Sequence, residues 1–257
     1  MTQTERLDTL LGLLLKEQSR YAGIKVPDTP EDKKLLLRSL WNLRPPMPAD
    51  KAFLDIQDEY LKEELNNRGI TRLLDLTPIQ DRLYLWQGDI TALECGAIVN
   101  AANSQMLGCF VPCHGCIDNA IHTYAGIQLR LACYGLMKEQ GAPEPTGRAK
   151  ITPAFNLPSS FVLHTVGPVI SGALTSRDCE TLASCYRSCL SLAEQRGISS
   201  VAFCCISTGE FHFPNDRAAE IAVQTVKAYL QASGSDLSVL FNVFKDEDYS
   251  HYKRLLS

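Results

Sequence analysis

The sequence lacks the two glycine-rich motifs that mark the common nucleotide-binding folds. It contains no GxGxxG turn and no GxxxxGK(S/T) loop, so it indicates neither a dinucleotide-binding fold nor a nucleoside triphosphatase. It also lacks a long apolar run. The strongest run near the start, residues 10–15, is too short to span a bilayer and follows Glu5, Arg6 and Asp8. We therefore expect no membrane-spanning helix and no export signal.

Basic charge is also scarce. The chain has 25 Lys and Arg against 29 Asp and Glu, a net charge of −4. This argues against a protein that binds nucleic-acid phosphates, because such proteins carry clustered Lys and Arg. Internal repeats and low-complexity segments are absent. The 257 residues, 45% of them apolar, are enough for one sizeable core and a small additional subdomain.

Cysteine is abundant, with ten residues, but its placement does not indicate disulfides. Cys185 and Cys189 have helical spacing, and Cys204 and Cys205 lie within an apolar, strand-like run. Free thiols at such positions behave as small hydrophobic groups. Without an export signal, this pattern is typical of a reduced, cytoplasmic protein. Nothing in the sequence demands an assembly larger than a monomer.

The first part of the chain predicts three amphipathic helices. Leucines repeat at helical spacing over residues 4–16. A second helix begins with Thr29 as N-cap and Pro30 as its first residue, and it ends before the prolines of residues 45–48. A third helix covers about residues 50–67. We expect residues 1–70 to form a helical extension that packs against a domain of residues 71–257. The sequence of the extension shows no cluster of side chains typical of a catalytic or metal site.

After this extension, short apolar strands alternate with longer helical patterns. Strands that are apolar along their whole length indicate burial on both faces of a sheet. The pattern predicts a three-layer α/β/α sandwich with a mixed, mostly parallel sheet. The strands are expected at 83–87, 97–100, 160–166, 200–206 and 237–244, and the helices from about 118 and at 178–195, 215–231 and 246–256.

Three cysteines and one histidine fall within eight positions of one loop, namely Cys109, Cys113, His114 and Cys116. This combination of side chains suits zinc. Three ligands from the loop would leave one coordination position open, as in catalytic rather than structural zinc sites. The adjacent Cys113 and His114 would have difficulty in reaching one metal ion together.

Other interpretations of the same loop stay open. Cys113 and Cys116 form a CxxC pair, as in redox proteins, although a long irregular loop precedes them in place of a strand and a helix start. The four groups could also be structural and bind no metal. Asp118 follows at the start of a helix, where it is either a carboxylate favoured by the helix dipole or a base held beside the site.

Two loops occupy the place where such folds bind ligands, outside the carboxyl ends of the strands. The first spans residues 101–118, and the second spans residues 207–214 ahead of a helix. Small residues and glycine at such a position offer backbone N–H groups to an anion such as a diphosphate. For the second loop, an ordinary strand-to-helix turn is the alternative interpretation.

Four motifs, in this order, resemble the macrodomain, a module that binds ADP-ribose. They are GDIT at 88–91, IVNAAN at 98–103, IDNAIHTYAG at 117–126 and ISTGEFHFP at 206–214. In place of the glycine-rich loop of that fold stands LGCFVPCHGC, which resembles the zinc-dependent macrodomains that occur beside a sirtuin-type ADP-ribosyltransferase. The likeness extends over residues 70–250, and the N-terminal helices also resemble those of this subfamily.

The resemblance implies a role for individual residues. Asp89 would accept a hydrogen bond from the adenine amino group, and Asn103 would reach the distal ribose. Asp118, with Asn103, would be catalytic. One zinc ion would be held by Cys109, His114 and Cys116, which leaves Cys113 free. The remaining residues implied to bind ADP-ribose are Ile90, Ile117, Asn119 and the diphosphate loop Ser207, Thr208, Gly209, Glu210 and Phe211.

The implied reaction is removal of a single ADP-ribose unit from a protein side chain. In the zinc branch the linkage is an ester to Asp or Glu, on a lipoyl-carrier protein of the glycine-cleavage type. A sirtuin-type ADP-ribosyltransferase and a lipoate ligase are the implied protein partners.

Two other functions remain as alternatives. One is a reader that binds ADP-ribosylated protein without cleaving it, although a reader gains little from an open zinc position beside a carboxylate. The other is a metal-stabilised thiol oxidoreductase, which requires a disulfide between Cys113 and Cys116.

Overall fold

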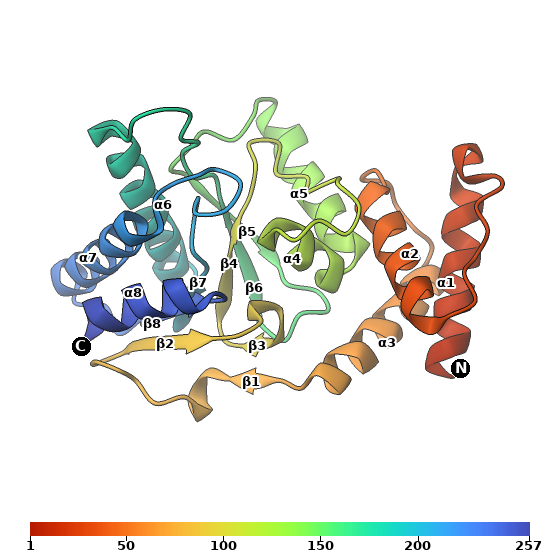
Figure 1. The fold of residues 1–257 in the computed structure, drawn as a ribbon, viewed down its shortest axis with the longest axis horizontal. Coiled ribbons are helices and arrows are strands. Elements are labelled where there is room, and N and C mark those ends of the chain that lie inside the picture. Colours follow the sequence, from red (N-terminus) through yellow and green to blue (C-terminus); the bar gives the residue numbers. More distant parts are fainter.

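A six-stranded sheet lies between two layers of helices in the computed structural model, which describes residues 1–257 (Figure 1). Its spatial order is β2-β8-β7-β4-β6-β5, and every neighbouring pair is parallel except β5 with β6. The prediction of a three-layer fold with a mixed, mostly parallel sheet is confirmed. The strands are β2 (Leu83–Gln87), β4 (Ala97–Ala101), β5 (Ala149–Pro153), β6 (Phe161–Thr165), β7 (Ser200–Phe203) and β8 (Ser238–Val243).

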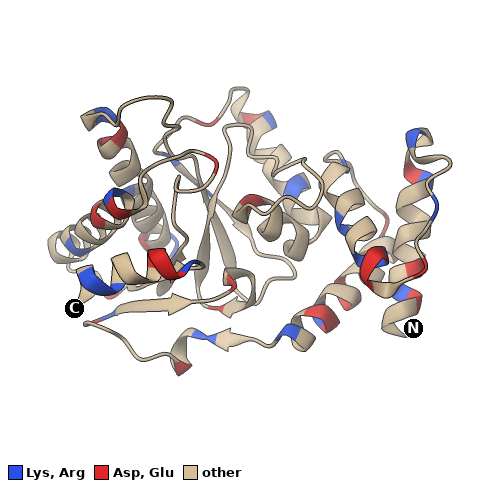
Figure 2. Cartoon of the chain, in the orientation of Figure 1, with Lys and Arg blue, Asp and Glu red and all other residues tan.

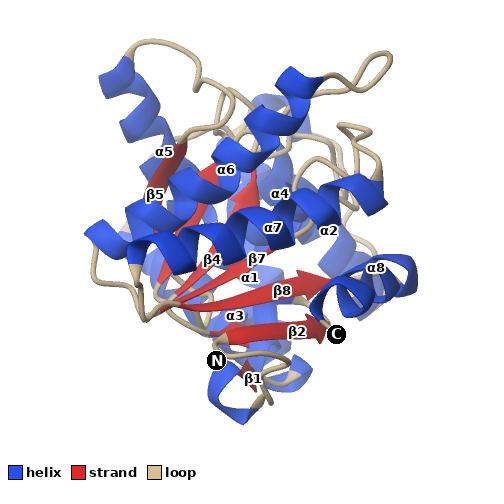
Figure 3. Cartoon of the chain, turned by 90° about the vertical axis from the view of Figure 1, so that its left-hand side faces the viewer, coloured by secondary structure: helices blue, strands red, loops and turns tan.

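Helices cover both faces of the sheet (Figure 3). One layer consists of α4 (Ile117–Ala125) and α5 (Ile127–Gln140), and the other of α6 (Ser176–Gln195), α7 (Asn215–Ser233) and α8 (Asp246–Leu256). β4 and β7 are apolar and buried almost throughout because helices lie above and below them. A core of 42 buried residues joins the three layers, and Cys185, Cys189 and Cys204 belong to it.

Three further helices form the N-terminal part of the chain: α1 (Gln3–Glu17), α2 (Pro30–Leu43) and α3 (Lys51–Arg68). Each begins at a capping side chain, from Thr2, Thr29 and Asp50 respectively, as the sequence indicated for Thr29. They share a second core of 12 buried residues, which Ile127 of α5 completes. The helices lie beside α4 and α5, at the end of the molecule farthest from α7 and α8 (Figure 1).

Short elements connect the larger ones. β1 (Thr71–Arg72) pairs with β3 (Leu93–Glu94), and three 3-10 helices occur at Ser19–Tyr21, Leu73–Asp75 and Ile90–Ala92. Acidic and basic residues are interspersed along most of the helices (Figure 2). No helix combines the length and the apolar character that are needed to cross a bilayer.

Three sequence predictions were wrong in detail. The strand predicted at 200–206 ends at Phe203, and the single helix predicted after residue 118 is two helices. The break occurs at Gly126, whose φ of 90° lies outside the helical region. β5 was not predicted, because it is an edge strand with Lys150 and Pro153 among its five residues and lacks a continuous apolar pattern.

Candidate functional site

A cleft of about 1010 Å³ opens at the carboxyl ends of β2, β4, β7 and β8. This is the edge at which parallel α/β sheets bind ligands. All the sequence-predicted site residues except Asn119 line it. They are Asp89, Ile90, Asn103, Cys109, His114, Cys116, Ile117, Asp118, Ser207, Thr208, Gly209, Glu210 and Phe211.

Asp89 lies at one end of the cleft, in the turn after β2. Its Oδ1 accepts hydrogen bonds from the backbone N–H of Thr91 at 2.9 Å and from Thr91 Oγ1 at 2.7 Å. Its Oδ2 lies 2.7 Å from Nη1 of Arg68, which comes from α3. The side chain is 44% exposed. These donors fix the carboxylate while one edge of it still faces the cleft.

The loop between β7 and α7 offers free backbone donors. None of the N–H groups of residues 207–211 donates a hydrogen bond within the protein. Ser207 adopts a left-handed conformation with φ of 65°, which turns the chain around this site. Gly167 approaches from the loop after β6, and a Cβ at this position would lie 2.0 Å from Ser207 Oγ. The loop therefore forms a concave row of N–H groups of the kind that binds a diphosphate.

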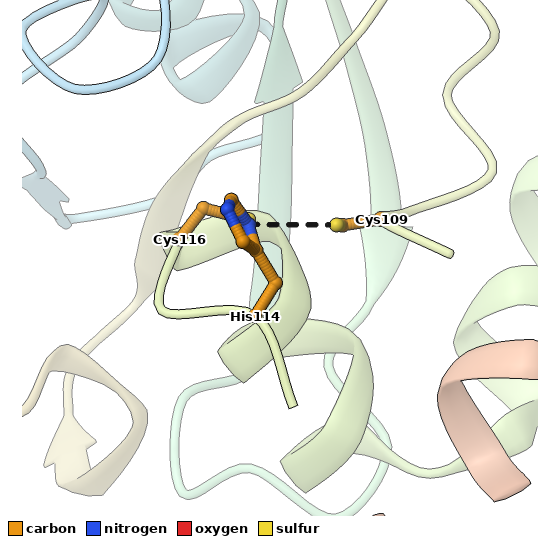
Figure 4. Close-up of side chains that lie close together, drawn as sticks. All are labelled: Cys109, His114 and Cys116. Atoms are coloured by element: carbon orange, nitrogen blue, oxygen red, sulfur yellow. Dashed lines mark hydrogen bonds between the residues drawn. The ribbon is translucent and has the colours of Figure 1, made fainter. Parts of the chain in front are cut away.

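Cys109, His114 and Cys116 converge on one point at the other end of the cleft (Figure 4). Their ligand atoms all lie within 4.8 Å of one another, and Cys109 Sγ is 3.6 Å from His114 Nδ1. Two ligands at ordinary zinc bond lengths in a tetrahedron are ~3.5 Å apart. The spacing and the two-thiol, one-imidazole donor set therefore fit a zinc ion with one open position.

Neighbouring groups orient two of these side chains. His114 Nε2 lies 3.5 Å from Glu210 Oε1, a contact that leaves Nδ1 as the nitrogen turned towards Cys109. Cys116 is the N-cap of α4, where its Sγ accepts from the N–H of Asn119 at 3.4 Å. Burial raises the pKa of the Cys116 thiol to about 12. A metal ion that binds there must displace this proton.

Cys113 does not join the cluster. Its backbone has φ of 52°, and its Sγ lies 3.3 Å from Ser39 Oγ and 3.4 Å from the Leu35 carbonyl oxygen, both on α2. Adjacent Cys113 and His114 thus point in different directions, as the sequence suggested. The convergent group of Cys109, His114 and Cys116 therefore does not include Cys113.

Asp118 lies in the first turn of α4, at the inner wall of the cleft, with 5% of its surface exposed. Its Oδ1 accepts from Asn100 Nδ2 at 2.8 Å, and its Oδ2 lies 3.4 Å from Asn103 Nδ2. Burial raises the pKa of Asp118 to about 6, although the Asn100 hydrogen bond opposes this rise. The Asp118 carboxylate and the Asn103 carboxamide thus lie next to each other in the cleft that Cys109, His114 and Cys116 also line.

Three buried polar side chains, Asn100, His122 and His164, lie on the side of Asp118 away from the cleft. His122, one helical turn later, has Nε2 3.5 Å from Asp118 Oδ1, and Asn100 Nδ2 lies 3.2 Å from His164 Nδ1. Burial lowers the pKa of both histidines, that of His164 to about 3, so both rings are neutral. With 5% of its surface exposed, His122 is part of the protein interior.

Comparison with known proteins identifies the family. The profile of the family described as "Macro domain" matches residues 99–222. A "Protein-ADP-ribose hydrolase" of Treponema medium is 56% identical over 100% of both chains, and one of Staphylococcus aureus (strain MRSA252) is 48% identical over 96% of this chain and 94% of its own. The Trypanosoma brucei macrodomain, solved in complex with ADP-ribose, is 30% identical, covers 90% of this chain and 97% of its own, and has a TM-score of 0.66.

The chain belongs to the macrodomain family. The expectation drawn from its four motifs is therefore confirmed for the family and the fold. This macrodomain brings the GDIT turn, the closing asparagine of IVNAAN and the 207–211 loop around one cleft, although they are far apart in the sequence.

Asn119 is the sequence-predicted site residue that this macrodomain does not place in the cleft. It is fully buried, its Oδ1 accepts from Arg38 and its Nδ2 donates to the Val111 carbonyl at 3.0 Å. Asn119 lies on α4 next to Asp118, and successive positions on a helix point in different directions, so only one of the two faces the ligand. Asn119 instead faces α2.

The sequence did not identify Arg38, which lines the cleft from α2. Its guanidinium contacts Asn119 Oδ1 and the His114 carbonyl. Arg38 is the one residue of the N-terminal helices that lines the cleft, a contribution that the sequence did not indicate. No signal in the local sequence distinguishes Arg38 from any other basic residue on an amphipathic helix.

Proposed function

We propose that the protein is a zinc-dependent hydrolase that removes mono-ADP-ribose from a modified protein side chain. Two relatives that match the chain over almost its whole length are named protein-ADP-ribose hydrolase. The observation that carries the proposal is the convergence of Cys109, His114 and Cys116 in the same cleft as Asn103 and Asp118. A binding module has no need for this combination.

Residues at several places along the cleft bind the ADP-ribose unit. Asp89 and Ile90 receive the adenine, and the N–H groups of residues 207–211 receive the diphosphate. The distal ribose then extends towards Asn103 and Ile117, beside the metal ligands. Binding energy from the nucleotide thereby holds the bond to be broken in a fixed position.

The chemistry takes place beside Asp118. Cys109, His114 and Cys116 would hold a zinc ion, which would supply Lewis-acid chemistry beside the distal ribose. Asp118 and Asn103 orient the attacking water, and Asn100 keeps the Asp118 carboxylate in place through its 2.8 Å hydrogen bond. Addition of water across the bond yields free ADP-ribose and the unmodified side chain.

The proposal also specifies the substrate. We assign an ester of ADP-ribose with Asp or Glu on a lipoyl-carrier protein of the glycine-cleavage type, modified by a sirtuin-type ADP-ribosyltransferase and supplied with lipoate by a ligase. In this arrangement residues 71–257 carry the macrodomain, and residues 1–70 are an extension of it.

A release assay tests the proposal. The wild type and the variants Cys109→Ala, Cys116→Ala and Asp118→Asn are incubated with a mono-ADP-ribosylated lipoyl-carrier protein, and free ADP-ribose is measured by mass spectrometry. Cys113→Ala is the matched control, because this thiol lies on the same loop but is turned towards α2.

The expected result is that the wild type and Cys113→Ala release ADP-ribose. The two ligand variants should lose zinc and fall by ~100-fold or more in kcat, because loss of a ligand should cost at least as much as loss of a group that orients one. A folded, zinc-free Cys109→Ala protein with normal turnover would exclude the zinc mechanism. Tight binding of ADP-ribose without any release by the wild type would instead support the reader function.

A further inference from the structure

We infer that the N-terminal helices are a working part of the active site, in which Arg68 and Arg38 hold the two ends of the cleft. The inference rests on the proposed function and deepens it. α3 delivers Arg68 to the Asp89 end, and α2 delivers Arg38 to the metal-ligand end. Both are positioning residues, because each acts on the ligand through another group.

Arg68 positions the carboxylate of Asp89. Its Nη1 donates to Asp89 Oδ2 at 2.7 Å and to Thr91 Oγ1 at 2.9 Å. The guanidinium also lies over the ring of Tyr124, 3.7 Å from its centroid, and Tyr124 lines the cleft. The Arg68 side chain therefore contacts Asp89, which is predicted to bind adenine, as well as Thr91 of the same turn and the ring of Tyr124.

Arg38 positions the loop of residues 107–116, called here the metal-ligand loop because it carries Cys109, His114 and Cys116. Its Nε and Nη2 donate to Asn119 Oδ1 at 3.1 and 2.7 Å, and Nη2 also donates to the His114 carbonyl at 3.0 Å. Asn119 passes the restraint on, because its Nδ2 donates to the Val111 carbonyl at 3.0 Å. The guanidinium thus braces the segment that carries His114.

A second residue of α2 contacts the same loop. Asn42 Oδ1 accepts from the Cys113 N–H at 2.8 Å, and Asn42 Nδ2 donates to Thr123 Oγ1 of α4 at 3.1 Å. The loop has no regular secondary structure between Ala101 and Ile117, so its shape depends on such external contacts. A rigid helix with a planar guanidinium is well suited to fix it.

The partners of Arg38 differ from those of arginines that only stabilise the helical extension. Arg6, paired with Glu63, and Arg44, paired with Glu17, join helices of the extension to one another. Arg38 forms no ion pair and donates only to groups beside the metal ligands. Its contacts therefore join α2 to the start of α4 and to the His114 backbone, and they do not join one helix of the extension to another.

The test compares three Arg→Met variants in the full-length chain. Arg38→Met and Arg68→Met each remove the guanidinium contacts at one end of the cleft. Arg6→Met is the matched control, because Arg6 belongs to the extension, is ion-paired and does not line the cleft. For each protein we would measure bound zinc, the Kd for ADP-ribose by calorimetry, kcat and KM for ADP-ribose release, and the unfolding temperature.

The two variants should fail in different ways. Arg38→Met should lower zinc affinity or kcat by ~10-fold, a typical effect of losing a group that orients a metal ligand. Arg68→Met should raise the Kd for ADP-ribose and the KM by ~10-fold, the effect of a lost charged hydrogen bond, with little change in kcat. Arg68→Lys should recover part of this affinity, since it restores the charge.

Arg6→Met should lower only the unfolding temperature. The inference is overturned if Arg38→Met and Arg68→Met match Arg6→Met in zinc content, Kd and kinetics, or if all three lose activity only in proportion to stability. Failure of the proposed function is a separate outcome, recognised by a wild type that releases no ADP-ribose. The zinc and Kd measurements still decide the inference in that case.

Discussion

At the scale of single residues, Gly167 determines how closely two loops of the cleft approach each other. A Cβ at this position would lie 2.0 Å from Ser207 Oγ and 2.9 Å from Ile206 Cγ2. Ser207 and Ile206 are both buried, so neither side chain has open space to move into. The absence of a side chain at residue 167 thus maintains the shape of the loop that we propose as the diphosphate site.

We predict that Gly167→Ala displaces this loop. The overpacking should cost ~1–3 kcal/mol of stability, and ADP-ribose should bind ~10-fold more weakly because the N–H groups are misplaced. Calorimetric titration with ADP-ribose checks the affinity. Gly172→Ala is the control, since a Cβ there meets nothing within 4 Å. Equal affinities of the two variants would contradict the role given to Gly167.

At the scale of elements, Arg130 joins α5 to the end of α2. Its Nη1 donates to the carbonyls of Trp41, Asn42 and Arg44, the first two of which belong to the last turn of α2. Its Nε donates to the Leu107 carbonyl at 2.7 Å, at the start of the metal-ligand loop. A cation is favourable at a helix C-terminus, where the last carbonyls lack partners.

Arg130→Met should therefore destabilise the protein strongly. The carbonyls of Asn42, Arg44 and Leu107 lose this donor, while that of Trp41 keeps the Arg44 N–H. We expect the free energy of unfolding to fall by ~3 kcal/mol or more, as for other broken buried charge networks. Urea denaturation measures the change. Arg187→Met provides the comparison, because Arg187 forms an exposed pair with Glu180, and such pairs contribute ~0–1 kcal/mol. A loss no larger than that of Arg187→Met would be inconsistent with this account.

The sequence was most informative where the signal is local. Thr29 and Pro30 located the start of α2, and continuous apolar runs located β4 and β8. The motif order located the cleft, because parallel strands bring their carboxyl ends to one edge. The residues of the loop offered four candidate ligands, and the resemblance to the zinc-dependent macrodomains selected Cys109, His114 and Cys116, whose side chains lie together in the structure.

The features that the sequence did not reveal depend on contacts between distant residues. Arg38 and Asn119 are 81 positions apart and meet only because α2 packs beside α4. No periodicity within either segment encodes this pairing. Asn119 consequently was predicted to face the ligand and in fact faces α2. β5 was missed for a related reason, since an edge strand is defined by its neighbour and not by its own composition.

At the scale of the whole molecule, buried neutral histidines link folding to pH. His164 is fully buried between Asn100 and Thr152, and burial lowers its pKa from 6.5 to about 3. Between these values the unfolded chain binds a proton that the folded protein excludes. The stability due to neutral His164 is therefore complete above pH 6.5 and is lost as the pH falls towards 3.

His164→Gln should weaken this dependence on pH. A change from pH 7 to pH 5 should cost the wild type ~2 kcal/mol more unfolding free energy than the variant, because one proton-linked group has been removed. His122 contributes in the same direction in both proteins, since burial also lowers its pKa. Urea denaturation at the two pH values measures the difference. Parallel losses in both proteins would show that His164 is not the group responsible.

Metal removal tests the central claim most directly: that a divalent ion at Cys109, His114 and Cys116 serves the cleft that binds ADP-ribose. Zinc content and ADP-ribose release are measured on the same sample before chelation, after chelation and after zinc is restored. We predict about one zinc per chain at the start, loss of release with loss of zinc, and recovery of both together. Full release by protein that contains no metal would contradict the account.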